Sequence, residues 1–246
     1  EPFGRHLDQY GEWEQCAHER LGQLLKPGDT VIDVGAHQGE HTIFFANRVG
    51  QSGEVHAIEA QKHLYNILCA NAAVQGLTQV HTHHACAGSK RGEVMRVPAI
   101  DPWQVGANFG ALSLLHDILP NEMWESVPVL QIDDLNLTSL ALIKVDVEGM
   151  ERDVLQGAAK TIRRLRPPLY LEHNLDEAGD FEGSLNLTLT VNEMGYDMYW
   201  VACQKYPENN FFGAPQHKLD GNGHSGKNVL CLPSPRDWLL DPGLVR

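Results

Sequence analysis

Apolar segments of strand length alternate with amphipathic helical segments from residue 30 to about residue 195. This alternation is typical of a parallel sheet whose strands are joined by helices. The expected strands cover residues 30–34, 54–59, 79–85, 140–145 and 168–172. The expected helices cover residues 39–49, 62–76, 151–165 and 184–194. Two later apolar segments, 196–202 and 228–232, predict a closing antiparallel hairpin. The pattern therefore predicts an α/β domain with a mostly parallel seven-stranded sheet and helices on both faces.

Residues 30–233 form one expected domain, preceded by a partly helical lead-in at 1–29 and followed by a tail at 234–246. Within this domain, residues 98–126 show little periodicity. A loop of that length inside a compact domain is usually functional, which predicts a lid or an acceptor-binding loop. Trp103 lies in this loop and either lines the acceptor site or fills the gap beneath the loop.

Composition narrows the classes of function. The chain has 246 residues and a formal net charge of −13, which argues against a nucleic-acid partner, because phosphate binding relies on clustered Lys and Arg. No apolar stretch approaches the ~20 residues of a membrane span, so no membrane partner is expected. The five cysteines are scattered and lack a C-x-x-C pair, so neither a disulfide framework nor a zinc knuckle is expected.

The most specific signal follows the first strand. Asp33 stands near the end of that strand, and a glycine turn, Gly35-x-x-x-Gly39, opens directly into a helix. The next strand ends in Glu59. Paired strand ends of this kind hold adenosine-containing cofactors at the carboxyl edge of a parallel sheet. A dinucleotide fingerprint would read G-x-G-x-x-G, whereas this turn lacks the middle glycine.

The acid before the turn separates two classes of cofactor. A carboxylate at Asp33 would repel a pyrophosphate but attract an ammonium group. S-adenosylmethionine has an ammonium, a sulfonium and no phosphate, so the sequence predicts this cofactor. The turn from Gly35 to Gly39 would hold its amino-acid end, since glycine lets the backbone approach closely. Glu59 would accept hydrogen bonds from both ribose hydroxyls. Because the cofactor is intracellular, a cytoplasmic protein is expected.

An unusual run of charges follows the strand at 140–145. Period-two alternation places Lys144, Asp146 and Glu148 on one side if the extended conformation persists. Charges in a strand that is buried on both faces are costly unless they are paired. Lys144 therefore either forms a supporting salt bridge to a neighbour such as Glu172 or takes part in function.

The carboxyl ends of two neighbouring strands are expected to meet here. Asp146 and Glu148 follow one strand, and Glu172 and His173 end the next. Open α/β sheets bind their ligands at this edge. These acids and the histidine, converging there, can form a base, a metal site or a set of acceptor-binding groups, with a satisfied surface pair as the structural alternative.

Three segments resemble the FkbM-type family of S-adenosylmethionine-dependent methyltransferases. They read DVGAHQGEHT at 33–42, IKVDVEGME at 143–151 and LYLEH at 169–173, with weaker support from NFGALS at 108–113. The resemblance covers about residues 28–233 and implies a Rossmann-like class I methyltransferase domain. The cofactor-binding residues predicted on this basis are Asp33, Gly35, Ala36, Gly39, Thr42, Glu59, Ala60, Ala85, Ser113 and Asp146.

The same resemblance implies O-methylation of a sugar or a natural-product small molecule, with S-adenosylhomocysteine as the second product. A hydroxyl is a poor nucleophile at neutral pH, so a base or a metal must help. His173 is the first candidate base, because the unperturbed pKa of histidine lies near neutrality, and Asp146 and Glu172 follow. The predicted substrate-binding residues are Trp103, Asn108 and Glu148.

Other interpretations stay open. The acceptor could instead be a carboxylate, and the product would then be a methyl ester. A carboxylate is already ionised, so it would need positioning rather than a base. An NAD-dependent oxidoreductase would share the alternating sheet, and a non-catalytic protein would bind S-adenosylhomocysteine without turnover. A small-molecule or glycan acceptor is the expected partner. Neither a need for a divalent metal nor the oligomeric state follows from the sequence.

Overall fold

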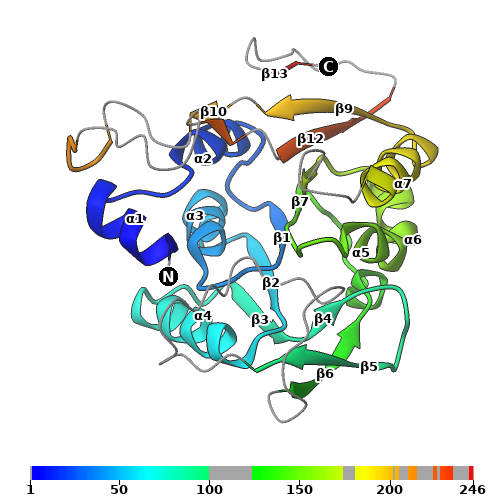
Figure 1. Cartoon of the computed structure of the whole chain (residues 1–246), viewed down its shortest axis with the longest axis horizontal. Coiled ribbons are helices and arrows are strands. Elements are labelled where there is room, and N and C mark those ends of the chain that lie inside the picture. Colours follow the sequence, from blue (N-terminus) through cyan, green and yellow to red (C-terminus); the bar gives the residue numbers. More distant parts are fainter. Residues whose placement is uncertain are drawn as a thin grey trace.

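An eight-stranded sheet forms the centre of the computed structural model (Figure 1). The structure describes residues 2–99, 124–173, 181–201, 203–204, 210–214, 224–225, 228–234 and 244–245. Across the sheet, the strands are ordered β13 (Leu244–Val245), β9 (Tyr196–Val201), β12 (Asn228–Pro233), β8 (Leu169–Glu172), β7 (Leu142–Val145), β1 (Thr30–Val34), β2 (Glu54–Glu59) and β3 (Val80–His84).

The direction of the strands confirms the predicted sheet. The strands from β8 to β3 pair in parallel. In contrast, β12 is antiparallel to both β8 and β9, which makes the closing hairpin. One strand more than expected is present, because the short β13 adds to the edge at β9.

Helices cover both faces of the sheet (Figure 1). They are α1 (Pro2–Tyr10), α2 (Gln15–Gly22), α3 (Glu40–Val49), α4 (Lys62–Val74), α5 (Glu151–Gly157), α6 (Ala159–Leu165) and α7 (Phe181–Glu193). On one face, α2 and α3 contribute Leu21 and Phe45 to a core cluster. On the other face, α5, α6 and α7 contribute Val154, Ile162 and Val191. Among the described residues, no helix has the length and apolarity that crossing a bilayer requires.

Two small sheets stand beside the main one. The first has the order β4 (Cys86–Ala87), β6 (Trp124–Leu130) and β5 (Val94–Pro98), and a 3-10 helix, η2 (Ile132–Leu135), follows β6. The second pairs β10 (Cys203–Gln204) with β11 (His224–Ser225). The residue pattern also predicts extended segments at 92–97 and 127–132, and these correspond to β5 and β6. Most of the predicted loop, with Trp103, Asn108 and Ser113, lies outside the described residues.

The single helix expected at 151–165 is wrong in one respect, because α5 and α6 are separated at Ala158. The second helix has its own start. The carboxylate of Asp133 accepts hydrogen bonds from the backbone amides of Lys160, at 3.1 Å, and Thr161, at 2.8 Å. These two amides would otherwise be unsatisfied in the first turn of a helix. Asp133 lies 27 residues before Lys160 in the sequence, so the hydrophobic pattern around α6 does not indicate this cap.

The cysteines also depart from expectation. Cys16 is disulfide-bonded, whereas Cys69, Cys86 and Cys231 are free. The sequence predicts no disulfide framework, and it gives no sign of the disulfide at Cys16. Spacing alone could not reveal this disulfide, because the fold decides which cysteines come within bonding distance.

Candidate active site

Alternation along the central strands places charged side chains on one face of the sheet. In β1, Val31 belongs to the core cluster beneath α2 and α3, so Asp33, two residues on, projects to the same face. Tyr170 and Glu172 are related in the same way in β8. Lys144 lies in register beside Asp33 on the parallel strand β7. The charges therefore share the face that α2 and α3 cover.

The glycine turn joins β1 to α3 and passes close to the end of β7. Gly35 and Gly39 both have positive φ, at 70° and 94°. A Cβ added at Gly35 would collide with the backbone oxygen of Asp146, and one at Gly39 would lie 2.7 Å from Leu68 Cδ1. Both glycines are thus required by local packing and dihedral angle. The turn and Asp146 consequently form one continuous surface at the carboxyl edge.

Glu59 lies at the end of β2 and is buried. Its Oε2 accepts a hydrogen bond from the amide of His37 in the glycine turn, and its Oε1 accepts one from the amide of Gln61, both at 2.8 Å. Burial raises the pKa of the Glu59 carboxyl, and these two amides oppose that shift. Each carboxylate oxygen can accept more than one hydrogen bond, so both retain capacity for a diol.

Three small residues contact the backbone at the end of β2 or follow it directly. Ala36 is buried in the turn, and its amide donates to the carbonyl of Ile58 at 3.1 Å. Ala60 follows Glu59 directly, and the amide of Ala85 donates to the carbonyl of Glu59 at 3.2 Å. The predicted residues at the ends of β1, β2 and β3 are therefore brought together.

Asp33 and Lys144 form a buried ion pair beneath the turn. Lys144 Nζ lies 3.3 Å from Asp33 Oδ1 and donates to the carbonyl of Gly35 at 2.9 Å. Thr42 Oγ1 donates to Asp33 Oδ2 at 2.6 Å. Asp33 is thus fully buried and supports the turn from within the sheet.

Lys144 also reaches the edge of the sheet, since its Nζ lies 3.6 Å from Asp146 Oδ2. Although burial alone would lower it, the pKa of Lys144 is raised above its usual value by the carboxylates of Asp33 and Asp146. The lysine is therefore a permanent cation. The expected supporting salt bridge exists, but with these two acids rather than with Glu172.

Asp146, Glu148 and Glu172 bring one carboxylate oxygen each to within 4.8 Å of one another. They come from the ends of β7 and β8, as the sequence predicts. The side chain of Asp146 is 43% exposed and open to an acceptor. Burial, followed by the charges of Asp146 and Glu148, raises the pKa of Glu172 to about 10. Glu172 is therefore protonated at neutral pH and able to donate a hydrogen bond.

Glu151 positions this acidic cluster, a role that sequence reasoning missed. It is buried, and its Oε1 accepts hydrogen bonds from the amides of Val147, at 3.1 Å, and Gly149, at 3.2 Å. Glu148, between them, has a φ of 51°, which is uncommon for a residue other than glycine. Glu151 thus holds the turn that aims Glu148 at its neighbours. The sequence suggested only an acid in the first turn of a helix.

His173 is not brought together with these acids. It follows Glu172 directly, so it projects to the opposite face of the sheet. Its Nε2 lies 3.0 Å from Thr188 Oγ1 on α7, and its ring packs edge-on against Trp200. Burial lowers the pKa of His173. The side chain is thus neutral and held among residues of the far layer.

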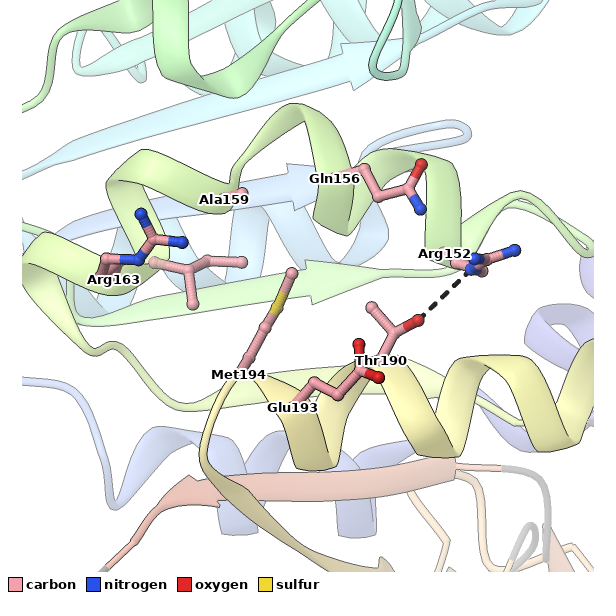
Figure 2. A pocket seen from close by; sticks show the side chains of 8 residues that line it. Arg152, Gln156, Ala159, Arg163, Thr190, Glu193 and Met194 are labelled. Carbon is pink, nitrogen blue, oxygen red and sulfur yellow. Dashed lines mark hydrogen bonds between the residues drawn. The ribbon is translucent and has the colours of Figure 1, made fainter.

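A groove of about 410 Å³ lies elsewhere, between α5, α6 and α7 (Figure 2). Figure 2 shows Arg152 of α5 reaching across it to Thr190 of α7, where its Nε donates to Oγ1 at 3.3 Å. The groove is lined by Arg152, Gln156, Ala159, Ile162, Arg163, Thr190, Glu193 and Met194. None of these residues belongs to the predicted site, so this groove and the carboxyl edge are separate features.

Several solved structures share this fold. An FkbM methyltransferase from Methylobacillus flagellatus KT superposes with a TM-score of 0.51 at 17% identity, covering 88% of this chain and 50% of that one. The chain thus spans half the length of that enzyme. A proposed rRNA methylase from Clostridium thermocellum gives a TM-score of 0.52 at 13% identity, covering 88% and 92%. SMU.1697c from Streptococcus mutans, crystallised with S-adenosylhomocysteine, gives 0.50 at 11% identity, covering 90% and 97%.

No curated protein matches the chain in sequence. At such low identities the solved structures show the fold alone. The family is shown by its sequence model, because the model of the methyltransferase FkbM domain matches residues 33–198, which include the glycine turn, Glu59, Lys144 and the acidic cluster. The chain therefore belongs to the FkbM family of S-adenosylmethionine-dependent methyltransferases.

Proposed function

We propose that this chain transfers a methyl group from S-adenosylmethionine to a hydroxyl of a neutral acceptor, a sugar or a natural-product small molecule. The observation that carries the proposal is the cluster of three carboxyl groups beside the glycine turn. That cluster provides both hydrogen-bond acceptors for hydroxyls and a candidate base. The acidic edge and the cofactor turn are in contact, so donor and acceptor would meet there.

The described residues fit the cofactor. Glu59 presents two buried carboxylate oxygens for the ribose hydroxyls, and residues 35–39 offer a turn without side-chain obstruction at its glycines. When bound, S-adenosylmethionine supplies a methyl group made electrophilic by its sulfonium. The buried pair of Asp33 and Lys144 keeps the turn in place from below. Methyl transfer is mainly a matter of holding the reacting atoms in line, so a rigid turn matters.

Asp146 is the proposed base in this structure. Its carboxylate is half exposed, at the point where the turn meets the sheet edge, and Lys144 Nζ stands 3.6 Å behind it. It would accept the proton of the attacking hydroxyl. Protonated Glu172 would donate a hydrogen bond to a neighbouring oxygen, and Glu148 would orient further hydroxyls. General-base assistance of this kind contributes about 10²–10⁴-fold to a rate.

The charge of the cluster bears on the choice between hydroxyl and carboxyl acceptors. A carboxylate acceptor would have to approach Asp146 and Glu148 against like charge. Lys144 Nζ, the positive group paired with Asp146, is buried and also held by Asp33 and Gly35. A neutral polyol meets no such repulsion and satisfies the carboxylates with its hydroxyls. The cluster thus supports ether formation over ester formation.

The test is transfer of isotopically labelled methyl to neutral polyols, sugars and matched carboxylic acids, followed by mild alkali. Label that survives alkali on a neutral acceptor supports the proposal, whereas label released as methanol means a methyl ester and overturns it. Asp146→Asn should abolish most turnover, while Glu193→Gln, an exposed acid on α7, serves as the control. Repeating the assay with a chelator decides whether a divalent metal takes part.

The proposed place of action is the cytoplasm, where S-adenosylmethionine is available. The disulfide at Cys16 points the other way, since disulfides persist mainly in oxidising compartments. Counting blocked thiols in protein isolated from its native cells separates these possibilities. A reduced Cys16 supports the cytoplasm, and an oxidised Cys16 favours an oxidising compartment.

A further inference from the structure

Two histidines and two glutamates converge where the lead-in segment packs on the domain. His18 lies on the buried side of α2, and Glu40 and His41 form the first turn of α3, directly after Gly39. His18 is 7% exposed and His41 8% exposed. Glu14, which precedes α2, contacts His41 from the lead-in side. None of these side chains belongs to the predicted methyltransferase site.

The distances in this cluster match those around a tetrahedral metal ion. His41 Nε2 lies 3.4 Å from Glu40 Oε2 and 3.3 Å from Glu14 Oε2, and His18 Nε2 lies 2.7 Å from Glu40 Oε1. His18, Glu40 and His41 each offer a ligand atom within 4.8 Å of the others. Ligands held at about 2.0–2.1 Å from zinc in a tetrahedron lie roughly 3.3 Å apart. The cluster therefore needs little movement to bind such an ion.

Two of these buried atoms face each other without a well-formed hydrogen bond. His18 Nε2 and Glu40 Oε1 lie 2.7 Å apart, yet no well-aligned hydrogen bond joins them or links either atom to another described group. Buried polar atoms without a well-formed hydrogen bond are rare because desolvation costs free energy. The ring of His18 stacks on Phe44, with centroids 4.3 Å apart, which fixes its direction. A fixed imidazole whose nitrogen faces a carboxylate without a well-aligned hydrogen bond is arranged as a metal ligand.

The donor set also selects the kind of ion. Imidazole nitrogen suits zinc and the later first-row metals, whereas calcium and magnesium take oxygen ligands. The two carboxylates of Glu40 and Glu14 balance the charge of a divalent ion. Without metal, a proton on His41 fills the same electrostatic role, because Glu40 and Glu14 outweigh the effect of burial and raise its pKa to about 9.

We propose that His18, Glu40 and His41 form a zinc-type divalent metal site, with Glu14 beside the remaining position. The ion would join α2 to the first turn of α3 and so fasten the lead-in segment to the helix that follows the cofactor turn. The site is distinct from the acidic cluster, and it stands whether or not the acceptor is a hydroxyl.

The test uses untagged protein stripped with chelator and then titrated with zinc chloride by calorimetry, and with cobalt chloride by visible absorption. One tightly bound ion per chain and the strong visible bands of tetrahedral cobalt are expected. His18→Gln and Glu40→Gln should weaken binding by roughly 100-fold or more, the upper end of losses seen for residues that only support a metal ligand. Circular dichroism shows whether each variant is folded.

A matched control is the other described histidine cluster, where His56 Nδ1 and His83 Nε2 lie 3.2 Å apart. His83→Gln should bind zinc as the parent protein does. Zinc at about 100 times its Kd should also raise the melting temperature by roughly 5–10 °C in the parent and in His83→Gln, but not in His18→Gln. No binding by the folded parent, binding retained by both His18→Gln and Glu40→Gln, or binding lost with His83→Gln would each overturn the proposal.

Discussion

Alternate residues of β1, β7 and β8 point to opposite faces of the sheet, and the two faces carry different kinds of side chain. Beneath α5, α6 and α7 the face is apolar and is made by Ile32, Ile143 and Leu171. Beneath α2 and α3 the corresponding positions near the carboxyl edge carry ionisable side chains, those of Asp33, Lys144 and Glu172. Both faces are covered by helices, so burial alone does not distinguish them.

The difference shows how a sheet buried on both sides can carry chemistry. The apolar face needs no specific partners, whereas the buried ions of the other face are paired: Lys144 Nζ meets Asp33, Gly35 and Asp146. Paired charges persist in a buried layer because each offsets the desolvation of the next. The polar face then extends to the acidic cluster at the edge, while His173 is left on the apolar side.

The largest expected effect is a difference in turnover between a variant on the polar face and a variant on the apolar face. Asp146→Asn should lower kcat by about 10²–10⁴-fold, because it removes the base on the polar face. His173→Gln should change kcat by only a few-fold and lower the melting temperature instead, since it disturbs the contacts to Thr188 and Trp200. Labelled-methyl assays and thermal melts of both variants measure this. The reverse pattern would restore the sequence-based assignment of His173 as the base.

Breaking the buried ion pair should be the next largest effect. Lys144→Met leaves Asp33 buried without its cation, which should lower the free energy of unfolding by about 3–5 kcal/mol. Ile143→Val, the neighbouring change on the apolar face, should cost about 0.5–1.5 kcal/mol. Urea denaturation compares the two. Adding Asp33→Asn to Lys144→Met should recover part of the loss. Equal losses from Lys144→Met and Ile143→Val would show that charge pairing does not govern the polar face.

Much of the fold could be predicted because its signals are local. β1 and β2 have the predicted bounds, since each apolar run is preceded by a glycine-containing turn and carries an acid at or next to its last residue. The break between α5 and α6 could not be predicted, because Asp133 acts on Lys160 and Thr161 from a distant segment. Capping by a distant side chain depends on tertiary packing, and a periodic pattern does not record it.

The candidate site likewise has parts that the sequence predicts and parts that it does not. The pairing of a glycine turn with Glu59 follows from spacing, and the structure brings His37 of that turn to the carboxylate. Glu151 was missed because its contacts to Val147 and Gly149 exist only when the turn doubles back. The side of the sheet that His173 occupies could have been read from period two, since consecutive strand residues point to opposite faces.

A substitution at Glu59 tests the assignment of this residue to the cofactor ribose at the edge of the polar face. Glu59→Ala should weaken S-adenosylhomocysteine binding by about 1.5–3 kcal/mol, the usual worth of hydrogen bonds to a charged group. Glu54→Ala, an exposed acid at the start of the same strand, should leave the affinity unchanged. Calorimetric titration of both variants measures this. Equal affinities for the two would remove the ribose assignment while leaving the sheet edge untouched.

The smallest expected effect concerns Glu172, the protonated acid of the polar face. The pKa of Glu172 is raised from 4.5 to about 10, mainly by burial and then by Asp146 and Glu148. Because the folded pKa lies above the unfolded value, the folded state holds the extra proton between these limits. The contribution of Glu172 is therefore complete below pH 4.5 and is lost as the pH rises through about 10.

Glu172→Gln keeps the shape of the protonated acid but cannot lose a proton. It should therefore raise the melting temperature at pH 8, by about 2–4 °C for each kcal/mol gained in a chain of this size. It should also flatten the decline in stability between pH 5 and pH 10, which thermal melts across that range would record. Glu125→Gln, at an acid of β6, is the control and should keep the slope of the parent protein. An unchanged slope in Glu172→Gln would mean that Glu172 is ionised in the folded chain, and the polar face would then need a further cation to hold it.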